Sequence, residues 1–207
     1  MTGPTHRPRW PGADLPGRRL FVAVPLPDAA TAEIAELVAS VRGDGVPGGG
    51  RDVRWVRLDG LHLTLRFLGP TLEDRVEAAA AAVRSAAAAS AAFDGSIGGA
   101  GAFPSAGRPR ALWLGLRSGE EDLSALAGTV DDALRSAGFA FETRPYQAHL
   151  TLARSDGVRA GAATAARLVE AAANLEVPFR ADRIGLFESL TGGGPARYEP
   201  LLMAGLP

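Results

Sequence analysis

The 207-residue chain contains no cysteine and no lysine. Without cysteine it can form no disulfide, no thiolate metal site and no cysteine nucleophile. All 22 basic residues are arginine, so a lysyl–nucleotide intermediate, a lysine Schiff base and a P-loop lysine are excluded. Chemistry must come from other side chains, and the chain has only three histidines to offer.

The sequence also lacks long hydrophobic runs and a strong charge of either sign. No apolar stretch approaches the roughly 20 residues that a membrane span needs, and the N-terminus has no apolar region of the signal-peptide type. We therefore expect a cytoplasmic protein without membrane contact. The net charge of −1 argues against a broad basic face that would follow a duplex, and so against DNA as a partner.

Length and composition predict one domain. A hydrophobic fraction of 46% in a chain of this length supports a sizeable core. Residues 1–17, which include His6, contain arginines and prolines, and we expect them to form a disordered N-terminal extension. No low-complexity linker divides the rest, so residues 18–207 are predicted to form a single two-lobed domain.

A four-residue motif is the most informative feature that the chain does have. His-Leu-Thr-Leu occurs at residues 62–65 and again at residues 149–152, and so contains two of the three histidines. From this composition, a given histidine is followed by Leu-Thr-Leu with a chance of roughly one in a thousand. An internal repeat that duplicates a titratable side chain explains the pattern better than coincidence.

Hydrophobic periodicity predicts strands and helices in alternation. The expected strands cover residues 19–24, 53–57, 62–68, 93–103, 111–116, 139–143, 148–153, 181–189 and 197–203. The expected helices cover residues 28–42, 71–90, 120–137 and 160–173, and Asp28 and Thr71 are the predicted caps of the first two. Each half places one motif on a strand shortly before a helix. The predicted fold class is α+β, with two pseudo-symmetric lobes of antiparallel sheet plus helices around a central cleft.

The motifs would suit phosphodiester hydrolysis. Along a strand His62 and Thr64 share one face, as do His149 and Thr151, while the leucines face the core. One neutral imidazole could take a proton from water, one imidazolium could protonate the leaving oxygen, and the hydroxyls could donate to the phosphoryl oxygens. This scheme needs no metal or other cofactor.

Two other interpretations of the histidines stay open. A single histidine on a half-buried strand is more often a structural, hydrogen-bonded residue than a catalytic one, although the duplication argues against this. A metal site would need a third ligand such as Asp59 or Glu199, and nothing in the spacing singles one out.

Further polar and aromatic residues lie near the motifs. Arg154 follows His149 by five positions, so strict alternation aims it at the opposite face, and it reaches a phosphate only where the strand ends or twists. Arg66 shares the face of His62 by the same alternation. Three aromatic residues could stack on a nucleobase, although packing is the commoner role: Phe103, Tyr146 and Trp55.

The flanks of both motifs complete a family signature. Its parts are RLFVAVPLP at residues 19–27, WVRLDGLHLTLRFLG at 55–69, RPYQAHLTLAR at 144–154 and RYEPL at 197–201. Over roughly residues 18–202 the chain resembles the 2H phosphoesterases, specifically the bacterial RNA 2′,3′-cyclic phosphodiesterases, historically called 2′-5′ RNA ligases. The sequence departs from many relatives at Ala148, where proline is frequent, and at Gln147.

The resemblance implies hydrolysis of a terminal 2′,3′-cyclic phosphate to a 2′-phosphomonoester, on RNA ends or small cyclic nucleotides. It implies that His62 protonates the leaving 3′ oxygen and that His149 activates water. It further implies that Thr64, Thr151 and Arg154 bind the phosphate. Two alternatives remain: the reverse reaction, 2′-5′ ligation, and a non-catalytic module that binds RNA ends or nucleotides. A site formed within one chain gives no reason to expect more than a monomer.

Overall fold

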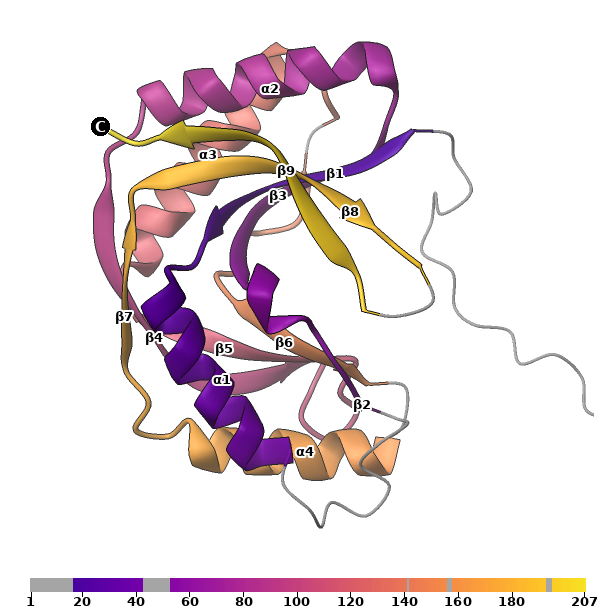
Figure 1. Cartoon of the computed structure of the whole chain (residues 1–207), viewed down its shortest axis with the longest axis vertical. Coiled ribbons are helices and arrows are strands. Elements are labelled where there is room, and N and C mark those ends of the chain that lie inside the picture. Colours follow the sequence, from indigo (N-terminus) through magenta and orange to yellow (C-terminus); the bar gives the residue numbers. More distant parts are fainter. Residues whose placement is uncertain (1–16, 43–52, 141, 156–157, 193–194) are drawn as a thin grey trace, which may run out of the picture.

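The computed structural model describes residues 17–42, 53–140, 142–155, 158–192 and 195–207. Nearly all of the expected N-terminal extension lies outside this part of the chain. The fold is α+β, as predicted, with two antiparallel sheets and four α-helices in the described residues. Figure 1 shows one sheet in the upper part of the molecule and the other in the lower part.

The first motif lies in the four-stranded upper sheet. The strand order is β3 (His62–Thr71), β1 (Arg18–Pro25), β8 (Arg183–Leu190) and β9 (Arg197–Gly205), and every neighbouring pair is antiparallel. Helix α2 (Glu73–Ala88) packs against β8 and β9, and α3 (Glu120–Ser136) packs against β3 and α2. β3 is thus an edge strand of this sheet.

The second motif lies in the five-stranded lower sheet. The order is β2 (Val53–Trp55), β6 (Leu150–Ser155), β5 (Ala111–Ser118), β4 (Phe93–Phe103) and β7 (Val177–Ala181). Helix α4 (Val158–Ala171) packs against β4, and α1 (Asp28–Arg42) packs against α4 and β7. A single 3-10 turn, η1 (Leu58–Gly60), connects β2 to β3.

The two lobes are not consecutive halves of the chain. The upper sheet takes β1 and β3 from the first half and β8 and β9 from the C-terminal end. Helix α1 follows an upper strand but packs in the lower lobe, whereas α3 follows a lower strand but packs in the upper one. These crossings tie the lobes together, because neither lobe is complete without segments from both ends of the chain.

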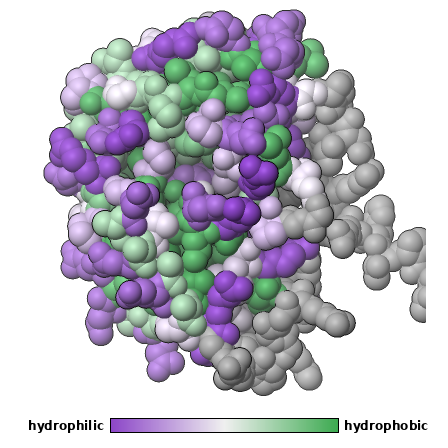
Figure 2. All heavy atoms as spheres, in the orientation of Figure 1, coloured by the Kyte–Doolittle hydropathy of each residue, from purple (hydrophilic) through white to green (hydrophobic). Residues whose placement is uncertain are grey.

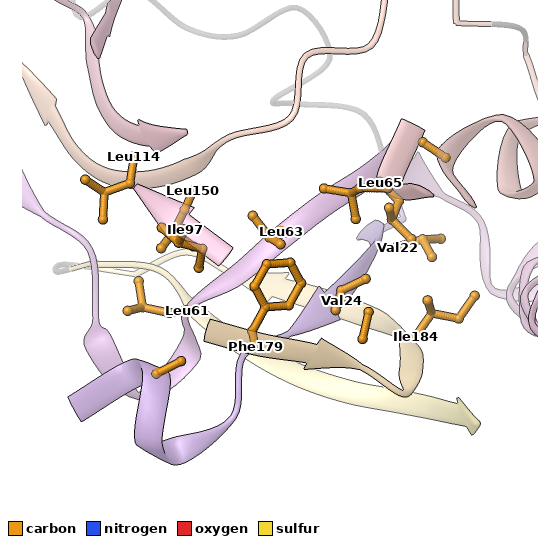
Figure 3. Packing of buried hydrophobic residues seen from close by; sticks show 14 of the residues in the cluster. Val22, Val24, Leu61, Leu63, Leu65, Ile97, Leu114, Leu150, Phe179 and Ile184 are labelled. Carbon is orange, nitrogen blue, oxygen red and sulfur yellow. The ribbon is translucent and has the colours of Figure 1, made fainter. Parts of the chain in front are cut away.

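The leucines of both motifs lie in one continuous hydrophobic core. Leu63, Leu150 and Leu152 are 0% exposed, and Figure 3 shows Leu63 in the same cluster as Leu150 and Ile97 of the other sheet. Truncating such a leucine to alanine costs about 2–5 kcal/mol. The histidines and threonines between these leucines are therefore held by side chains that anchor both strands.

On the outer surface, Figure 2 shows hydrophilic residues over much of the described face, with apolar residues grouped near its middle.

Some element boundaries differ from the sequence prediction. Helix α2 begins at Glu73 after Leu72, not after Thr71, because Thr71 is a buried end of β3 that pairs with Arg18. The described residues of 139–143 form no strand. Instead, this segment is bound by the side chain of Arg66, whose Nη2 donates a hydrogen bond to the carbonyl of Ala140.

The sequence prediction also missed β7 and merged its last residue with β8. The sequence Val-Pro-Phe-Arg-Ala alternates buried and exposed side chains in the structure, which is the signal of a half-buried strand. Pro178 lacks an N–H for a sheet hydrogen bond, and it is tolerated here because β7 is an edge strand.

Candidate active site

The imidazole of His62 has a fixed orientation. Its Nδ1 lies 2.7 Å from the carbonyl oxygen of Gly60, the last residue of η1. A carbonyl can only accept, so Nδ1 must carry the hydrogen and donate it. In the neutral ring this leaves Nε2 without a proton, as the nitrogen available to a substrate.

His149 is oriented in the same way. It lies immediately before β6, and its Nδ1 donates to the carbonyl oxygen of Gln147 at 2.7 Å. In both motifs the acceptor is the residue two positions before the histidine, although the two segments there, Gly-Leu and Gln-Ala, share no sequence. The backbone, and not a side chain shared by the two segments, thus sets the same tautomer at both sites.

The two motif strands lie next to each other, and each is bound by the segment that leads into the other. The N–H of Val56, which precedes the first motif, donates to the carbonyl of Leu152 at 2.9 Å. The hydroxyl of Tyr146, which precedes the second motif, donates to the carbonyl of Thr64 at 3.1 Å. β3 and β6 are in contact, so the structure brings both motifs to one place.

Aromatic rings surround His62. The ring centroid of Phe21 lies 4.8 Å from that of His62, and the Tyr198 ring meets the imidazole edge-on at 4.9 Å. Burial lowers the pKa of His62 below its ordinary value; the hydrogen bond to Gly60 opposes this shift, and the charge of His149 adds to it.

Each motif strand contains a β-bulge at its second leucine. In the β1–β3 pairing, Val22 faces Arg66 and Ala23 faces Thr64, which leaves Leu65 as the extra residue. In the β5–β6 pairing the extra residue is Leu152, between Thr151 and Ala153. A bulge places two successive residues opposite one and so changes which later side chains share a face.

The bulge in β3 explains why the prediction for Arg66 was wrong. Strict alternation places Arg66 on the face of His62, but Leu65 and Arg66 both point away from it. The Arg66 side chain is 10% exposed, and its Nε bonds Asp131 at 2.6 Å. Arg66 therefore joins β3 to α3 and is not part of the site.

The bulge in β6 has the opposite consequence for Arg154. Leu152 and Ala153 are both buried, while Thr151 is partly exposed and Arg154 is exposed. Thr151 and Arg154 thus share the open face of the strand despite their spacing. Burial raises the pKa of Tyr198, and the positive charge of Arg154 opposes that rise.

Sequence reasoning missed Phe67, which occupies in the first motif the position that Arg154 occupies in the second. It lies five residues after His62, is 54% exposed, and its ring centroid is 6.0 Å from that of Phe21. The repeat offered a signal, since alignment of the two motifs pairs Phe67 with Arg154. Phe67 is a large, open aromatic ring beside the motif.

The three aromatic residues that could stack on a nucleobase have packing roles, as favoured from the sequence. Phe103 meets the ring of His149 edge-on at 5.1 Å and also packs on Trp113. Tyr146 is largely buried, and burial raises the pKa of its hydroxyl. Trp55 packs against the core, with the Arg42 guanidinium 5.9 Å from its ring centroid.

The described residues contain no group of three or more histidine, aspartate or glutamate side chains that could hold a metal ion. Asp59, considered above as a third ligand, is bound by Arg57, whose guanidinium donates to both of its carboxylate oxygens at 3.1 and 2.5 Å. This ion pair lowers the pKa of Asp59.

Among the described residues, none of the helices combines the length and the hydrophobicity that a membrane span requires.

Two antiparallel sheets, their helices and a pair of adjacent His-x-Thr motifs are the features of a 2H phosphoesterase. Residues 26–193 match the profile of the 2′-5′ RNA ligase superfamily, and the chain belongs to that family.

Individual relatives agree with this assignment. A protein of Archaeoglobus fulgidus named RNA 2′,3′-cyclic phosphodiesterase is 35% identical over 136 residues, 66% of this chain and 72% of that one. A protein of the same name from Methanothermobacter thermautotrophicus is 31% identical over 179 residues, 86% of this chain and 93% of that one. The crystal structure of Escherichia coli LigT complexed with 3′-AMP is similar with a TM-score of 0.67 and 25% identity, covering 91% of this chain and 98% of that one.

Proposed function

We propose that this protein hydrolyses RNA-terminal or nucleoside 2′,3′-cyclic phosphates to 2′-phosphomonoesters by acid–base catalysis with His62 and His149. One observation carries the proposal: the motif strands are in contact, and each motif has an imidazole held by a backbone carbonyl at Nδ1, which leaves Nε2 available for proton transfer. The names of the A. fulgidus and M. thermautotrophicus relatives support the same substrate class. DNA lacks the 2′-hydroxyl from which a 2′,3′-cyclic phosphate is made, which limits the substrate to ribonucleotides.

In the proposed reaction His149 acts as the base and His62 as the acid. Nε2 of His149 takes a proton from water, whose oxygen forms a bond to phosphorus as the bond from phosphorus to O3′ breaks. Nε2 of His62, protonated at the start, gives its proton to O3′. The products are a 2′-phosphomonoester and a free 3′-hydroxyl.

The protonation state of His62 matters for its proposed role as the acid. Burial lowers its pKa, so the neutral imidazole is favoured in the free protein. An anionic cyclic phosphate beside the ring would favour the imidazolium again, because opposite charges in contact stabilise the charged form. Substrate binding would then favour the protonated His62 that the reaction needs as its acid.

Thr64, Thr151 and Arg154 are proposed to bind the phosphate. The two hydroxyls can donate to the non-bridging oxygens, whose charge increases in the transition state. Arg154 adds a guanidinium, which suits a phosphate because its planar N–H groups can bind two oxygens at once. All three side chains lie on the open faces of the motif strands.

The test is incubation of the purified protein with an RNA oligonucleotide that ends in a 2′,3′-cyclic phosphate, with EDTA present. We expect a terminal 2′-phosphate, together with a fall in kcat of about 10²–10⁴-fold in His62→Ala and His149→Ala. His6→Ala, which changes the third histidine, is the matched control and should retain activity. A 3′-phosphate product would show that the bond to O2′ breaks instead, so that the proton roles or the substrate orientation are reversed. Full activity in both motif variants would refute the mechanism.

The same incubation separates the two alternatives. With a 5′-hydroxyl oligonucleotide added, a 2′-5′ linked product would reveal ligation, which the same groups can catalyse in reverse. Saturable binding of the cyclic phosphate end without turnover at any pH would indicate a binding module.

A further inference from the structure

The structure contains a cavity beside the candidate site that the proposed reaction does not use. It measures about 150 Å³, which is roughly the volume of five water molecules in the liquid. A phosphate group has five heavy atoms, so the cavity matches it in size. The cavity is lined by Arg57, Asp59, Gly60, Ala196, Arg197 and Tyr198.

Two of these residues connect the cavity to His62. The carbonyl of Gly60 accepts the hydrogen bond from Nδ1 of His62, and the ring of Tyr198 contacts the imidazole edge-on. Gly60 and Tyr198 are also in close contact, since a Cβ at position 60 would lie 3.1 Å from the Tyr198 ring. The wall that positions the histidine is therefore also a wall of the cavity.

The charged lining residues favour an anion. Two guanidinium groups face one carboxylate, so the lining has an excess of one positive charge. Arg57 uses its Nε and one terminal nitrogen on Asp59, and a guanidinium has five N–H donors, so others are left for a ligand.

Arg197 is a second donor at the cavity. The nearest carboxylate oxygen paired with it belongs to Glu199 and lies 3.8 Å from Nη2, which is longer than a hydrogen bond. The Arg197 side chain is 67% exposed. It can thus reach an incoming anion without first breaking a short ion pair to Glu199.

We propose that this cavity binds the backbone phosphate next to the terminal cyclic phosphate of an RNA chain. This inference rests on the proposed function, and it narrows the substrate from any cyclic nucleotide to an oligoribonucleotide end. A nucleoside cyclic phosphate has only one phosphate, whereas an RNA end carries a second, one nucleotide away. Arg57 and Arg197 select the longer substrate by binding that second charge.

The test compares two substrates that differ by one phosphate: adenosine 2′,3′-cyclic phosphate and the dinucleotide ApA ending in a 2′,3′-cyclic phosphate. We expect wild type to prefer the dinucleotide. The kcat/KM for the dinucleotide divided by that for the mononucleotide should fall about tenfold in Arg197→Ala, and by a similar factor in Arg57→Ala. This is the size of effect expected for loss of a charged hydrogen bond. Arg183→Ala, which removes an exposed arginine paired with Asp182, is the matched control and should leave the ratio unchanged.

A chemical variant isolates the charge. Replacing the internal linkage of the dinucleotide with an uncharged methylphosphonate should reduce the wild-type preference by at least the factor that one arginine substitution does. In a double variant, Arg57→Ala with Arg197→Ala, the methylphosphonate should have little further effect, since both groups that bind the charge are absent. An unchanged ratio in both arginine variants, or a wild type indifferent to the methylphosphonate, would overturn the proposal.

Binding measurements keep this inference separate from the proposed function. Titration calorimetry with adenosine 2′-phosphate and with ApA 2′-phosphate needs no turnover, and the ratio of their dissociation constants should depend on Arg57 and Arg197 in the same way. Wild type could hydrolyse neither cyclic substrate while the affinity ratio still fell in the two arginine variants. In that case the phosphate site would stand and the proposed activity would not. Hydrolysis of both substrates with an unchanged ratio would give the converse result.

Discussion

The hydroxyl of Tyr146 donates a hydrogen bond to the backbone carbonyl of Thr64 at 3.1 Å, and so joins the approach to the second motif with the first motif itself. The bond spans 82 positions of sequence between the two lobes. It acts together with the bond from Val56 to Leu152, which runs in the opposite direction. The relative position of the two motifs is therefore fixed by direct bonds as well as by the shared core.

Tyr146→Phe tests this connection because it removes only the hydroxyl. The carbonyl of Thr64 loses its partner, and we expect the free energy of unfolding in urea to fall by about 1 kcal/mol. Activity should fall several-fold without a change in the shape of its pH profile, since burial raises the pKa of Tyr146 and keeps the hydroxyl neutral. A loss of activity as large as that of a histidine variant would instead give the hydroxyl a direct part in catalysis.

Arg154 and Arg66 form a matched pair for testing the bulges. Arg154→Ala should lower kcat/KM by about tenfold, mainly through KM, because a charged donor to the phosphate is lost. Arg66→Ala should leave KM within twofold but lower the free energy of unfolding by about 2 kcal/mol, since its bond to Asp131 is lost. Steady-state kinetics and urea unfolding of both variants check this division.

The opposite outcome would have a clear meaning. If Arg66→Ala raised KM and Arg154→Ala did not, simple alternation would describe the strands better than the bulges do.

The bulges also show why part of the site could be predicted and part could not. The repeated tetrapeptide singled out two segments that the structure brings into contact, and alternation assigned the threonines correctly to the more exposed face, since both precede the bulge. After the bulge the same rule failed, and it placed Arg66 and Arg154 on the wrong faces. Nothing in His-Leu-Thr-Leu marks its second leucine as an extra residue, because pairing register depends on the neighbouring strand.

The fold shows the same limit. Periodicity identified most strands and all four α-helices of the described residues, because their buried side chains recur at the spacing of each element. It did not predict that α1 and α3 would exchange lobes, since both are amphipathic and could cover either sheet. The strand expected at residues 139–143 failed for a related reason: an apolar stretch predicts burial, and the side chain of Arg66 binds this segment without a strand partner.

Phe67 offers a test of base recognition. Its exposed ring lies on the open side of β3, where it could stack on the nucleobase, and such stacking is worth about 1–3 kcal/mol. Phe67→Ala should therefore raise KM for adenosine 2′,3′-cyclic phosphate at least about fivefold with little change in kcat, and Phe67→Trp should restore it. Leu72→Ala is the matched control, because Leu72 is 53% exposed and lies beyond β3. An effect of equal size in both alanine variants would contradict a role in stacking.

His62 should make the stability of the protein depend on pH. Its pKa in the folded protein lies below the ordinary value of 6.5, so near and below that pH the unfolded chain binds more protons. Stability from this group is therefore present above the ordinary histidine pKa and is lost as pH falls toward the lower, folded-state pKa. Between about pH 8 and 5, the free energy of unfolding of His62→Gln should fall less steeply than that of wild type, by at most about 1.4 kcal/mol per pH unit.

The lowered pKa of His62 should also appear in catalysis. Whether His62 gives or takes the proton, its lowered pKa sets one limb of the kcat/KM profile at a lower pH than an unperturbed histidine would. In His62→Gln that limb should disappear together with most of the activity. The pH dependence of kcat/KM on adenosine 2′,3′-cyclic phosphate, measured for wild type and for this variant, checks the result. A variant profile with the same limbs as wild type would contradict a proton-transfer role for His62.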